Sequence, residues 1–173
     1  MSAARLPPDF VQRARHLKLV LTDCDGVLTD GGVYYSDQGE AYKRFNIRDG
    51  MGVERLRDLA GIRTGIVTGE HSRSVVKRAE KLGILECHLG CKDKARTVLA
   101  ILERLKLSSA EAAYLGDDVN DLPAFGVVGL TACPSDALEQ VRAAADVVLV
   151  RAGGQGAFRE FAELVLSARC GAE

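Results

Sequence analysis

Two aspartates one residue apart, Asp23 and Asp25, end the hydrophobic, β-branched stretch of KLVLTDCDGVLTDGG, residues 18–32. Two carboxylates at one site repel each other and raise one pKa unless a cation lies beside them. Mg²⁺ suits such a pair, because it takes one or two protein carboxylates and keeps water and phosphate oxygens as its other ligands. The pair therefore predicts a Mg²⁺ site that also receives a phosphate.

Groups that suit the same chemistry recur later in the chain. Thr68 offers a hydroxyl, Lys94 a charge that can offset a phosphate, and Asp117 and Asp118 further carboxylates. Taken singly, each has an ordinary explanation, such as an Asx turn, a helix cap, a solvated turn or a surface lysine. A calcium-binding loop starting at Asp117 or Asp118 is excluded by spacing, because apolar residues fall at the alternate ligand positions. The order of these groups along the chain favours one shared site.

The elements that must position these groups follow an alternating pattern. Strands are expected at residues 19–22, 62–68, 86–89, 112–116, 127–132 and 146–150. Between them, apolar residues recur at helical spacing, most clearly from Ala95 to Leu105 and from Phe158 to Val165. This alternation predicts an α/β fold, a doubly wound, Rossmann-like parallel sheet with helices on both faces, in one domain of residues 1–173. Ligands of such sheets bind at the carboxyl ends of the strands, where the groups above fall.

Composition excludes several classes of partner. The 173 residues are 47% hydrophobic and 27% charged, with a formal net charge of −1. Such a balance gives no electrostatic footprint for nucleic acid or for an anionic membrane surface. No apolar run approaches the roughly 20 residues of a membrane span, and the N-terminal residues lack the apolar core of a signal peptide. We therefore expect a cytoplasmic protein whose partner is a small molecule.

The five cysteines are an odd number without secretory context, so reduced thiols are expected. Cys87, His88 and Cys91 could be read as part of a zinc cluster, but no second pair stands at the required spacing. Cys24 lies between the two aspartates and should face the core, because alternate residues of a strand point to opposite sides.

Residues 31–46 break the alternation and are read as a β-hairpin inserted directly after the first strand. Its expected strands, at Val33–Tyr35 and Ala41–Phe45, flank a turn at Ser36–Gly39. A lone hairpin is marginally stable, so its aromatic side chains are expected to pack on the domain or on another subunit.

Four motifs in this order resemble those of the haloacid dehalogenase-like (HAD-like) phosphatases. They are Asp23-x-Asp25-Gly26-Val-Leu-Thr29, Thr68-Gly69, Lys94 and Gly116-Asp117-Asp118-x-x-Asp121. The segments DGVLTDGG, FNIRDGMGV, RAEKLGI, AYLGDDVND and GGQGAFREF are similar to the subgroup without a cap domain, whose substrates are 3-deoxy-ulosonate sugar phosphates. The resemblance implies a Mg²⁺-dependent phosphatase acting through an aspartyl-phosphate. It also implies a homotetramer in which the hairpin joins a central barrel and helps to cover a neighbouring subunit's site.

The resemblance further implies a role for individual residues. Asp23 would be the nucleophile and Asp25 the general acid and base. The metal would be held by the Asp23 carboxylate, the Asp25 backbone carbonyl and the Asp117 carboxylate, with Asp118 as a possible water-mediated ligand. Transferring phosphoryl oxygens would bind Thr68, the Gly69 amide and Lys94. Substrate contacts would come from the turn formed by Asn46, Ile47, Arg48, Asp49 and Gly50, and from Glu70 and Arg78.

Two departures from the family pattern leave the substrate open. Glu70 stands where octulosonate enzymes commonly carry arginine, and Gln155 stands within GGQG where they tend to have GGRG. Glutamate cannot replace a carboxylate-binding arginine, but it can accept hydrogen bonds from sugar hydroxyls or an amine. The resemblance therefore leaves the expected substrate open between 3-deoxy-D-manno-octulosonate (KDO) 8-phosphate and a nine-carbon 9-phosphate of the KDN or N-acylneuraminate type. His71 could also touch it, although a solvated helix start is the favoured reading of this residue.

Three alternatives remain beside this interpretation. A receiver-type signalling domain also uses an aspartyl-phosphate, an acidic pair and a lysine, but its acidic pair comes early in the chain. A catalytically silent relative could serve as an oligomerisation or regulatory module, against which the complete set of Asp23, Asp25, Lys94 and Asp117 weighs. A phosphatase for another small sugar phosphate would use the same motifs.

Overall fold

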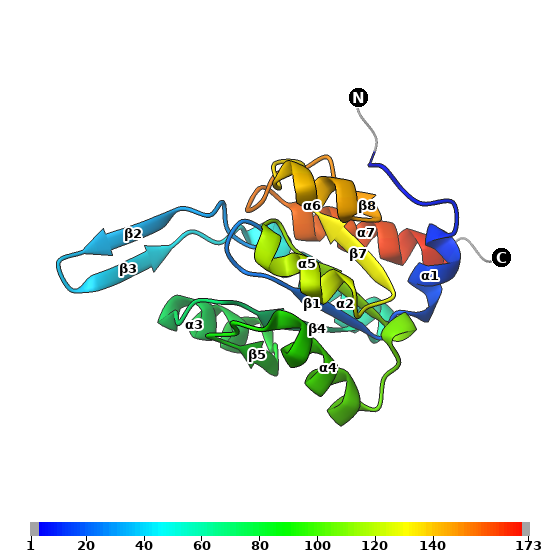
Figure 1. Ribbon diagram of the computed structural model, residues 1–173, viewed down its shortest axis with the longest axis horizontal. Helices are drawn as coiled ribbons and strands as arrows, with labels where there is room; N and C mark the ends of the chain where they lie inside the picture. The colour runs from blue at the N-terminus through cyan, green and yellow to red at the C-terminus, as the bar shows by residue number, and fades with distance from the viewer. Residues whose placement is uncertain (1–3, 171–173) are drawn as a thin grey trace.

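The computed structural model describes residues 4–170, and a six-stranded parallel sheet forms its centre (Figure 1). The strands, in sheet order, are β5 (Glu86–His88), β4 (Arg63–Val67), β1 (Leu19–Thr22), β6 (Ala112–Leu115), β7 (Leu130–Cys133) and β8 (Val147–Val148). From β1 the chain winds outward first through β4 and β5, and then returns to continue through β6, β7 and β8. The strand order therefore reverses beside β1, which is where such sheets bind ligands. The predicted doubly wound α/β fold is confirmed.

Helices cover both faces of the sheet. One face packs against α1 (Phe10–His16), α2 (Ile47–Ala60), α3 (Arg73–Leu82) and α7 (Ala157–Cys170). The other packs against α4 (Lys94–Leu105), α5 (Leu122–Phe125) and α6 (Glu139–Ala144). The first strand serves both cores, because Val20 points into one and its neighbours Leu19 and Leu21 into the other. Two short 3₁₀ helices, η1 (Ser109–Glu111) and η2 (Val119–Asp121), lie before and after β6.

A buried carboxylate joins α2 to α7. Asp49, in the first turn of α2, is 2% exposed and accepts hydrogen bonds from the backbone amides of Gly156, at 3.2 Å, and Arg159, at 2.9 Å. These amides belong to the N-terminal turn of α7, where free donors need an acceptor. The contact fixes the loop before α7 against the start of α2.

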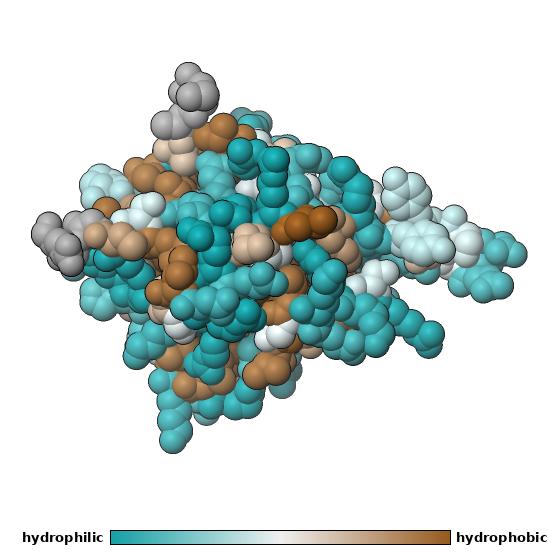
Figure 2. Space-filling view, turned by 180° about the vertical axis from the view of Figure 1, so that it is seen from behind, coloured by the Kyte–Doolittle hydropathy of each residue, from teal (hydrophilic) through white to brown (hydrophobic). Residues whose placement is uncertain are grey.

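The inserted hairpin projects from the body of the molecule (Figures 1 and 2). It consists of β2 (Val33–Ser36) and β3 (Gly39–Lys43), paired antiparallel. Three tyrosines are left open to solvent: Tyr34 is 61%, Tyr35 73% and Tyr42 72% exposed. The body of the chain therefore does not cover them, whereas Phe45, just beyond β3, is half-buried against the core.

Several element bounds differ from the sequence prediction. The strand expected at residues 127–132 begins only at Leu130, because the amide of Val127 bonds back to Ala124 and closes the turn after α5. The strand expected at 146–150 is reduced to Val147–Val148. The segment from Asn46 to Gly50, read as a turn, is instead the cap and first turn of α2, because the Asn46 side chain accepts the amide of Arg48.

Other expectations can be compared directly with the structure. All five cysteines are free, and Cys24 is fully buried in the core as predicted. Within residues 4–170, no helix combines the length and the apolar character needed to cross a bilayer.

Candidate active site

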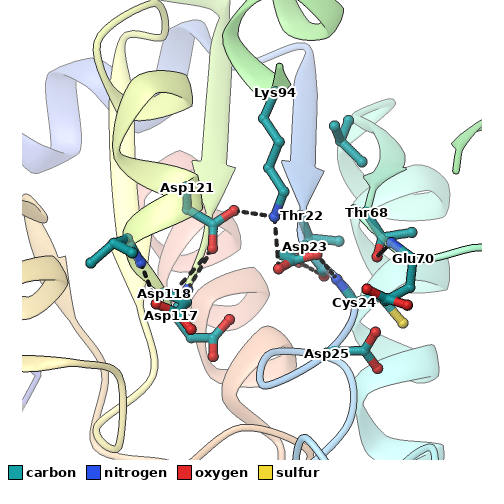
Figure 3. Close-up of polar contacts among 12 residues, drawn as sticks. Thr22, Asp23, Cys24, Asp25, Thr68, Glu70, Lys94, Asp117, Asp118 and Asp121 are labelled. Carbon is teal, nitrogen blue, oxygen red and sulfur yellow. Dashed lines mark hydrogen bonds and ion pairs between the residues drawn. The ribbon is translucent and has the colours of Figure 1, made fainter. Parts of the chain in front are cut away.

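The end of β1 places Asp23 between two neighbouring strands (Figure 3). Its backbone amide continues the sheet by donating to the carbonyl of Leu115 on β6, at 2.8 Å. Its side chain is nearly buried, and Oδ1 accepts the backbone amide of Cys24 at 2.7 Å. The carboxylate is thus held by the first turn after the strand, in a fixed position at the topological switch point.

Lys94, the first residue of α4, extends its side chain to the same point. Nζ lies 2.8 Å from Oδ2 of Asp23 and 2.6 Å from Oδ1 of Asp121, and the residue is 2% exposed. Burial lowers the pKa of Lys94, but the two carboxylates outweigh it and raise the pKa above its ordinary value. Lys94 therefore stays charged and connects strand β1 to the loop after β6.

Asp121 organises that loop from a fully buried position. Its Oδ2 accepts the amides of Asp117, at 3.0 Å, and Asp118, at 3.2 Å, while Oδ1 accepts the hydroxyl of Tyr114 at 2.9 Å. With Lys94 added, both carboxylate oxygens of Asp121 are occupied. Asp121 therefore fixes the backbone that presents Asp117.

Asp117 points into the site without a partner of its own. Its Oδ1 is buried and has no hydrogen bond among the described residues. Gly26 leaves the room for this carboxylate, because a Cβ there would lie 2.0 Å from Oδ2 of Asp117. Gly26 also has φ of +86°, a conformation that L side chains rarely adopt.

Burial and neighbouring negative charges raise the pKa of the carboxyl groups of Asp23 and Asp117. Burial, followed by the charges of Asp23 and Asp121, raises the pKa of Asp117 to about 8. Burial and the charge of Asp121 raise the pKa of Asp23 to about 7, despite the opposing effect of Lys94. The carboxylates of Asp23, Asp117 and Asp121 therefore carry more negative charge, when ionised, than the ammonium of Lys94 can neutralise.

These residues fit a divalent cation. Asp23, Asp117 and Asp121 each offer a carboxylate oxygen, and the three oxygens lie within 4.8 Å of one another. An orphaned buried oxygen on Asp117 is an atom that a hard cation would satisfy. Each oxygen of Asp121 already accepts two donors, whereas each oxygen of Asp23 has one and Oδ1 of Asp117 has none among the described residues, so Asp23 and Asp117 are better placed to ligate.

Asp25 lies on the other side of the loop after β1 and has a different environment (Figure 3). Its Oδ2 accepts the ammonium of Lys43, at the end of the hairpin, at 2.5 Å. Its Oδ1 is 3.4 Å from the hydroxyl of Thr29. The structure thus separates the two aspartates by partner: Lys94 for Asp23 and Lys43 for Asp25.

The end of β4 supplies the predicted hydroxyl. Thr68 is 1% exposed, and its Oγ1 accepts the backbone amide of Glu70 at 3.3 Å. The side chains of Glu70 and His71 are exposed beyond it. The ring of His71 packs over Gly90, where a Cβ would lie 2.2 Å from Nε2.

The predicted substrate residues other than Gly69 and Glu70 form a second cluster at the start of α2. Arg78 donates to the backbone carbonyl of Asn46 at 3.1 Å, and Asn46 donates to the carbonyl of Gly154 at 3.0 Å. Gly50 makes room for the Arg78 guanidinium, since a Cβ would lie 2.3 Å from Nη2. Arg48 is exposed, beside a hollow of about 430 Å³ at this helix start. Asp49 points the other way, into the cap of α7.

Comparison with known proteins identifies the family. The sequence profile of haloacid dehalogenase-like hydrolases matches residues 38–129, just over half of the 173-residue chain. The chain is 39% identical to the 3-deoxy-D-manno-octulosonate 8-phosphate phosphatase of Haemophilus influenzae, over 91% of this chain and 87% of that protein. It is 37% identical to the Escherichia coli phosphatase of the same name, over 93% of this chain and 85% of that one.

The chain belongs to the haloacid dehalogenase-like hydrolases.

A solved structure of this HAD-like group agrees closely in fold. It is the Moraxella catarrhalis 3-deoxy-D-manno-octulosonate 8-phosphate phosphatase in complex with magnesium, phosphate and KDO. The TM-score is 0.90 at 36% identity, covering 95% of this chain and 94% of that chain. The predicted family and the predicted enzyme class, a phosphoric monoester hydrolase, are confirmed.

Three residues of this HAD-like site were assigned no role from the sequence. Asp121 was noted only as part of a motif, and its signal was its spacing of four residues after Asp117. Tyr114 lies in an ordinary strand and Lys43 in the hairpin, so neither had a local signal. Their contribution depends on contacts between segments far apart in the chain.

The raised pKa of Asp117 predicts a pH-dependent stability in the metal-free protein. Between about pH 4 and about pH 8, the Asp117 carboxyl is ionised in the unfolded chain but protonated in the folded protein. The stability that is fully present below about pH 4 is therefore lost progressively as the pH rises to about 8. Asp117→Asn removes that loss. In the presence of chelator, the free energy of unfolding of Asp117→Asn relative to wild type should therefore rise by about 4 kcal/mol between about pH 5 and about pH 8.5, because each pH unit up to the folded pKa contributes about 1.4 kcal/mol.

Urea denaturation at the two pH values measures this difference. Asp58→Asn, at an exposed ion pair on α2, is the matched control for the loss of one carboxylate. At the higher pH, excess Mg²⁺ should make wild type more stable than Asp117→Asn, because the cation binds the folded wild type more tightly than the folded variant. A difference that stays constant with pH would show that the Asp117 carboxyl is not strained by its neighbours.

Proposed function

We propose that this protein is a Mg²⁺-dependent phosphatase of a 3-deoxy-ulosonate sugar acid, with 3-deoxy-D-manno-octulosonate 8-phosphate as the first candidate substrate. The observation that supports it is the convergence of Asp23, Lys94 and the unpartnered Asp117 oxygen at the strand ends. The relatives that share the fold over most of its length act on that ester by name. A nine-carbon 9-phosphate is the second candidate, which Glu70 favours.

In this proposal, Asp23 is the nucleophile. One of its carboxylate oxygens forms a bond to phosphorus while the bond from phosphorus to the sugar oxygen breaks, and Asp25 gives a proton to the departing alkoxide. Water then attacks phosphorus and gives a proton to Asp25, while the bond from phosphorus to the Asp23 oxygen breaks; this releases inorganic phosphate and restores both side chains. Asp23, the Asp25 carbonyl and Asp117 would hold Mg²⁺, which would supply positive charge that lets the substrate phosphate approach the Asp23 carboxylate.

The residues around Asp23 would hold the transferring group. Lys94, the Thr68 hydroxyl and the Gly69 amide can stabilise charge on the phosphoryl oxygens. Lys94 is already positioned within 2.8 Å of the nucleophile, so the same ammonium can contact both. Because α4 begins at Lys94 and β4 ends just before Thr68, these groups lie on rigid elements.

Contacts to the sugar acid would come from the rim. Arg48 is exposed at the start of α2 and can meet the substrate carboxylate, and Glu70 is exposed after β4 and can accept from hydroxyls or an amine. Asn46, Gly50 and Arg78 hold the shape of this rim through the contacts described above. The Asp49 carboxylate already accepts the amides at the start of α7. Its contribution to substrate binding would therefore be to fix the start of α2.

A phosphate-release screen tests the proposal. Octulosonate 8-phosphate, nonulosonate 9-phosphates and common hexose phosphates are compared at equal concentration, with Mg²⁺ and with chelator. We expect Mg²⁺-dependent release that is highest for one of the sugar acids. Asp23→Asn should reduce kcat by at least about a thousandfold with the fold unchanged.

Two results of the screen would contradict the proposal. Substantial turnover by Asp23→Asn would exclude this residue as nucleophile, and a preference for hexose phosphates would exclude the sugar-acid class. Asp9→Asn, at an exposed site before α1, serves as the matched control and should retain full activity.

A homotetramer joined through the hairpin is proposed as the active assembly. Three tyrosines with 61–73% of their surface exposed place aromatic side chains in solvent on a two-stranded element that is marginally stable alone. Sedimentation should give a tetramer for wild type and smaller species for Tyr34→Ser/Tyr35→Ser/Tyr42→Ser. Leu85→Ser, which replaces a residue 92% exposed before β5, should stay tetrameric. A monomeric wild type would refute the assembly.

A further inference from the structure

Lys43 brings the inserted hairpin into the active site. It is the last residue of β3, and its side chain is completely buried although the hairpin itself is open to solvent. Its ammonium lies 2.5 Å from Oδ2 of Asp25 and 3.6 Å from Oε2 of Glu40. The ammonium therefore contacts a carboxylate at the mouth of the site and one on its own strand.

The Asp25 carboxylate has few other restraints. It follows β1 on a loop, and its side chain is 23% exposed. Within residues 4–170, its second oxygen makes only the 3.4 Å contact with Thr29. The short ion pair to Lys43 is thus the strongest described contact that fixes where this carboxylate points. Without it, the side chain could rotate among its ordinary rotamers.

Lys43 is itself held by the strand that carries it. Its backbone pairs with Val33 across the hairpin. Glu40, three residues earlier in the same strand, accepts a hydrogen bond from the hydroxyl of Ser72. Ser72 is 2% exposed and stands directly before α3. Glu40 therefore connects β3 to the body of the protein. This contact fixes the position of the strand, and with it the position of the Lys43 ammonium beside Asp25.

We propose that Lys43 is a positioning residue of the phosphatase reaction, which holds Oδ2 of Asp25 by the ion pair and leaves Oδ1 to carry the proton that Asp25 gives to the leaving sugar oxygen. This inference rests on the proposed function. It means that the hairpin contributes to catalysis within its own subunit, in addition to any contact with a neighbouring one. A deletion of residues 33–44 would remove both contributions together.

The leaving group separates a positioning role from a purely structural one. An alkyl phosphate needs a proton on its departing oxygen, whereas 4-nitrophenyl phosphate releases a stable phenolate and gains little from an acid. The parameter kcat/KM reports the steps up to departure of the leaving group, so it isolates this proton transfer. Loss of positioning at Asp25 should therefore affect the alkyl ester selectively.

The test compares Lys43→Met and Lys43→Gln with wild type on both esters. We expect kcat/KM to fall at least about tenfold for the sugar phosphate and no more than about threefold for 4-nitrophenyl phosphate. Asp25→Asn should show the same selectivity. Lys43→Gln in the Asp25→Asn background should cost no further activity, because residues that act through one another are not additive. Lys77→Met, at an exposed pair on α3, is the control and should match wild type.

Equal losses on the two esters, or additive losses in the double variant, would overturn the role of Lys43 while leaving the phosphatase function intact. A wild-type protein inert toward both esters would instead refute the proposed function itself. If Lys43→Met fails to fold, Lys43→Gln keeps a polar group for Glu40 and carries the comparison. Circular dichroism and sedimentation of each variant verify that fold and assembly are unchanged.

Discussion

One buried ammonium, that of Lys94, lies between the carboxylates of Asp23 and Asp121 at 2.8 and 2.6 Å. Asp117 brings a third carboxylate close to them, and no ion pair to it exists within residues 4–170. Burial, and then the charges of the neighbouring carboxylates, which Lys94 only partly offsets, raise the pKa of Asp117 to about 8. A site of this kind is completed by a further cation, and an anionic substrate can then enter it.

The fold holds these like charges together with strand ends and with the hydrogen bonds of buried groups. The carboxyl ends of β1 and β6 bring Asp23 and the loop of Asp117 side by side, and two backbone amides fix that loop to Asp121. The fully buried Tyr114 adds its hydroxyl to the same carboxylate. Gly26 contributes by having no side chain, because any side chain there would occupy the place of the Asp117 carboxylate. Each contact restrains a group that would otherwise move away from its neighbours.

Much of this arrangement could be predicted from the sequence, because it depends on local pattern. The first strand, Leu19–Thr22, was predicted with its observed bounds, and strand ends in a parallel sheet converge whatever the details of packing. Lys43 could not be predicted in the same way, since its role requires the end of an inserted hairpin to meet a loop 18 residues earlier in the chain. Asp49 illustrates the reverse: its position beside predicted substrate residues suggested binding, and only the packing of α2 on α7 reveals the cap.

The account as a whole depends on the charge imbalance at the strand ends. Calorimetric titration of Mg²⁺ into the metal-free protein at about pH 7, in two buffers of different ionisation enthalpy, counts the protons that leave on binding. Because Asp117 and part of the Asp23 population must ionise to accept the cation, we expect roughly one proton to be released for each Mg²⁺ bound. Mg²⁺ binding without net proton release would contradict the account.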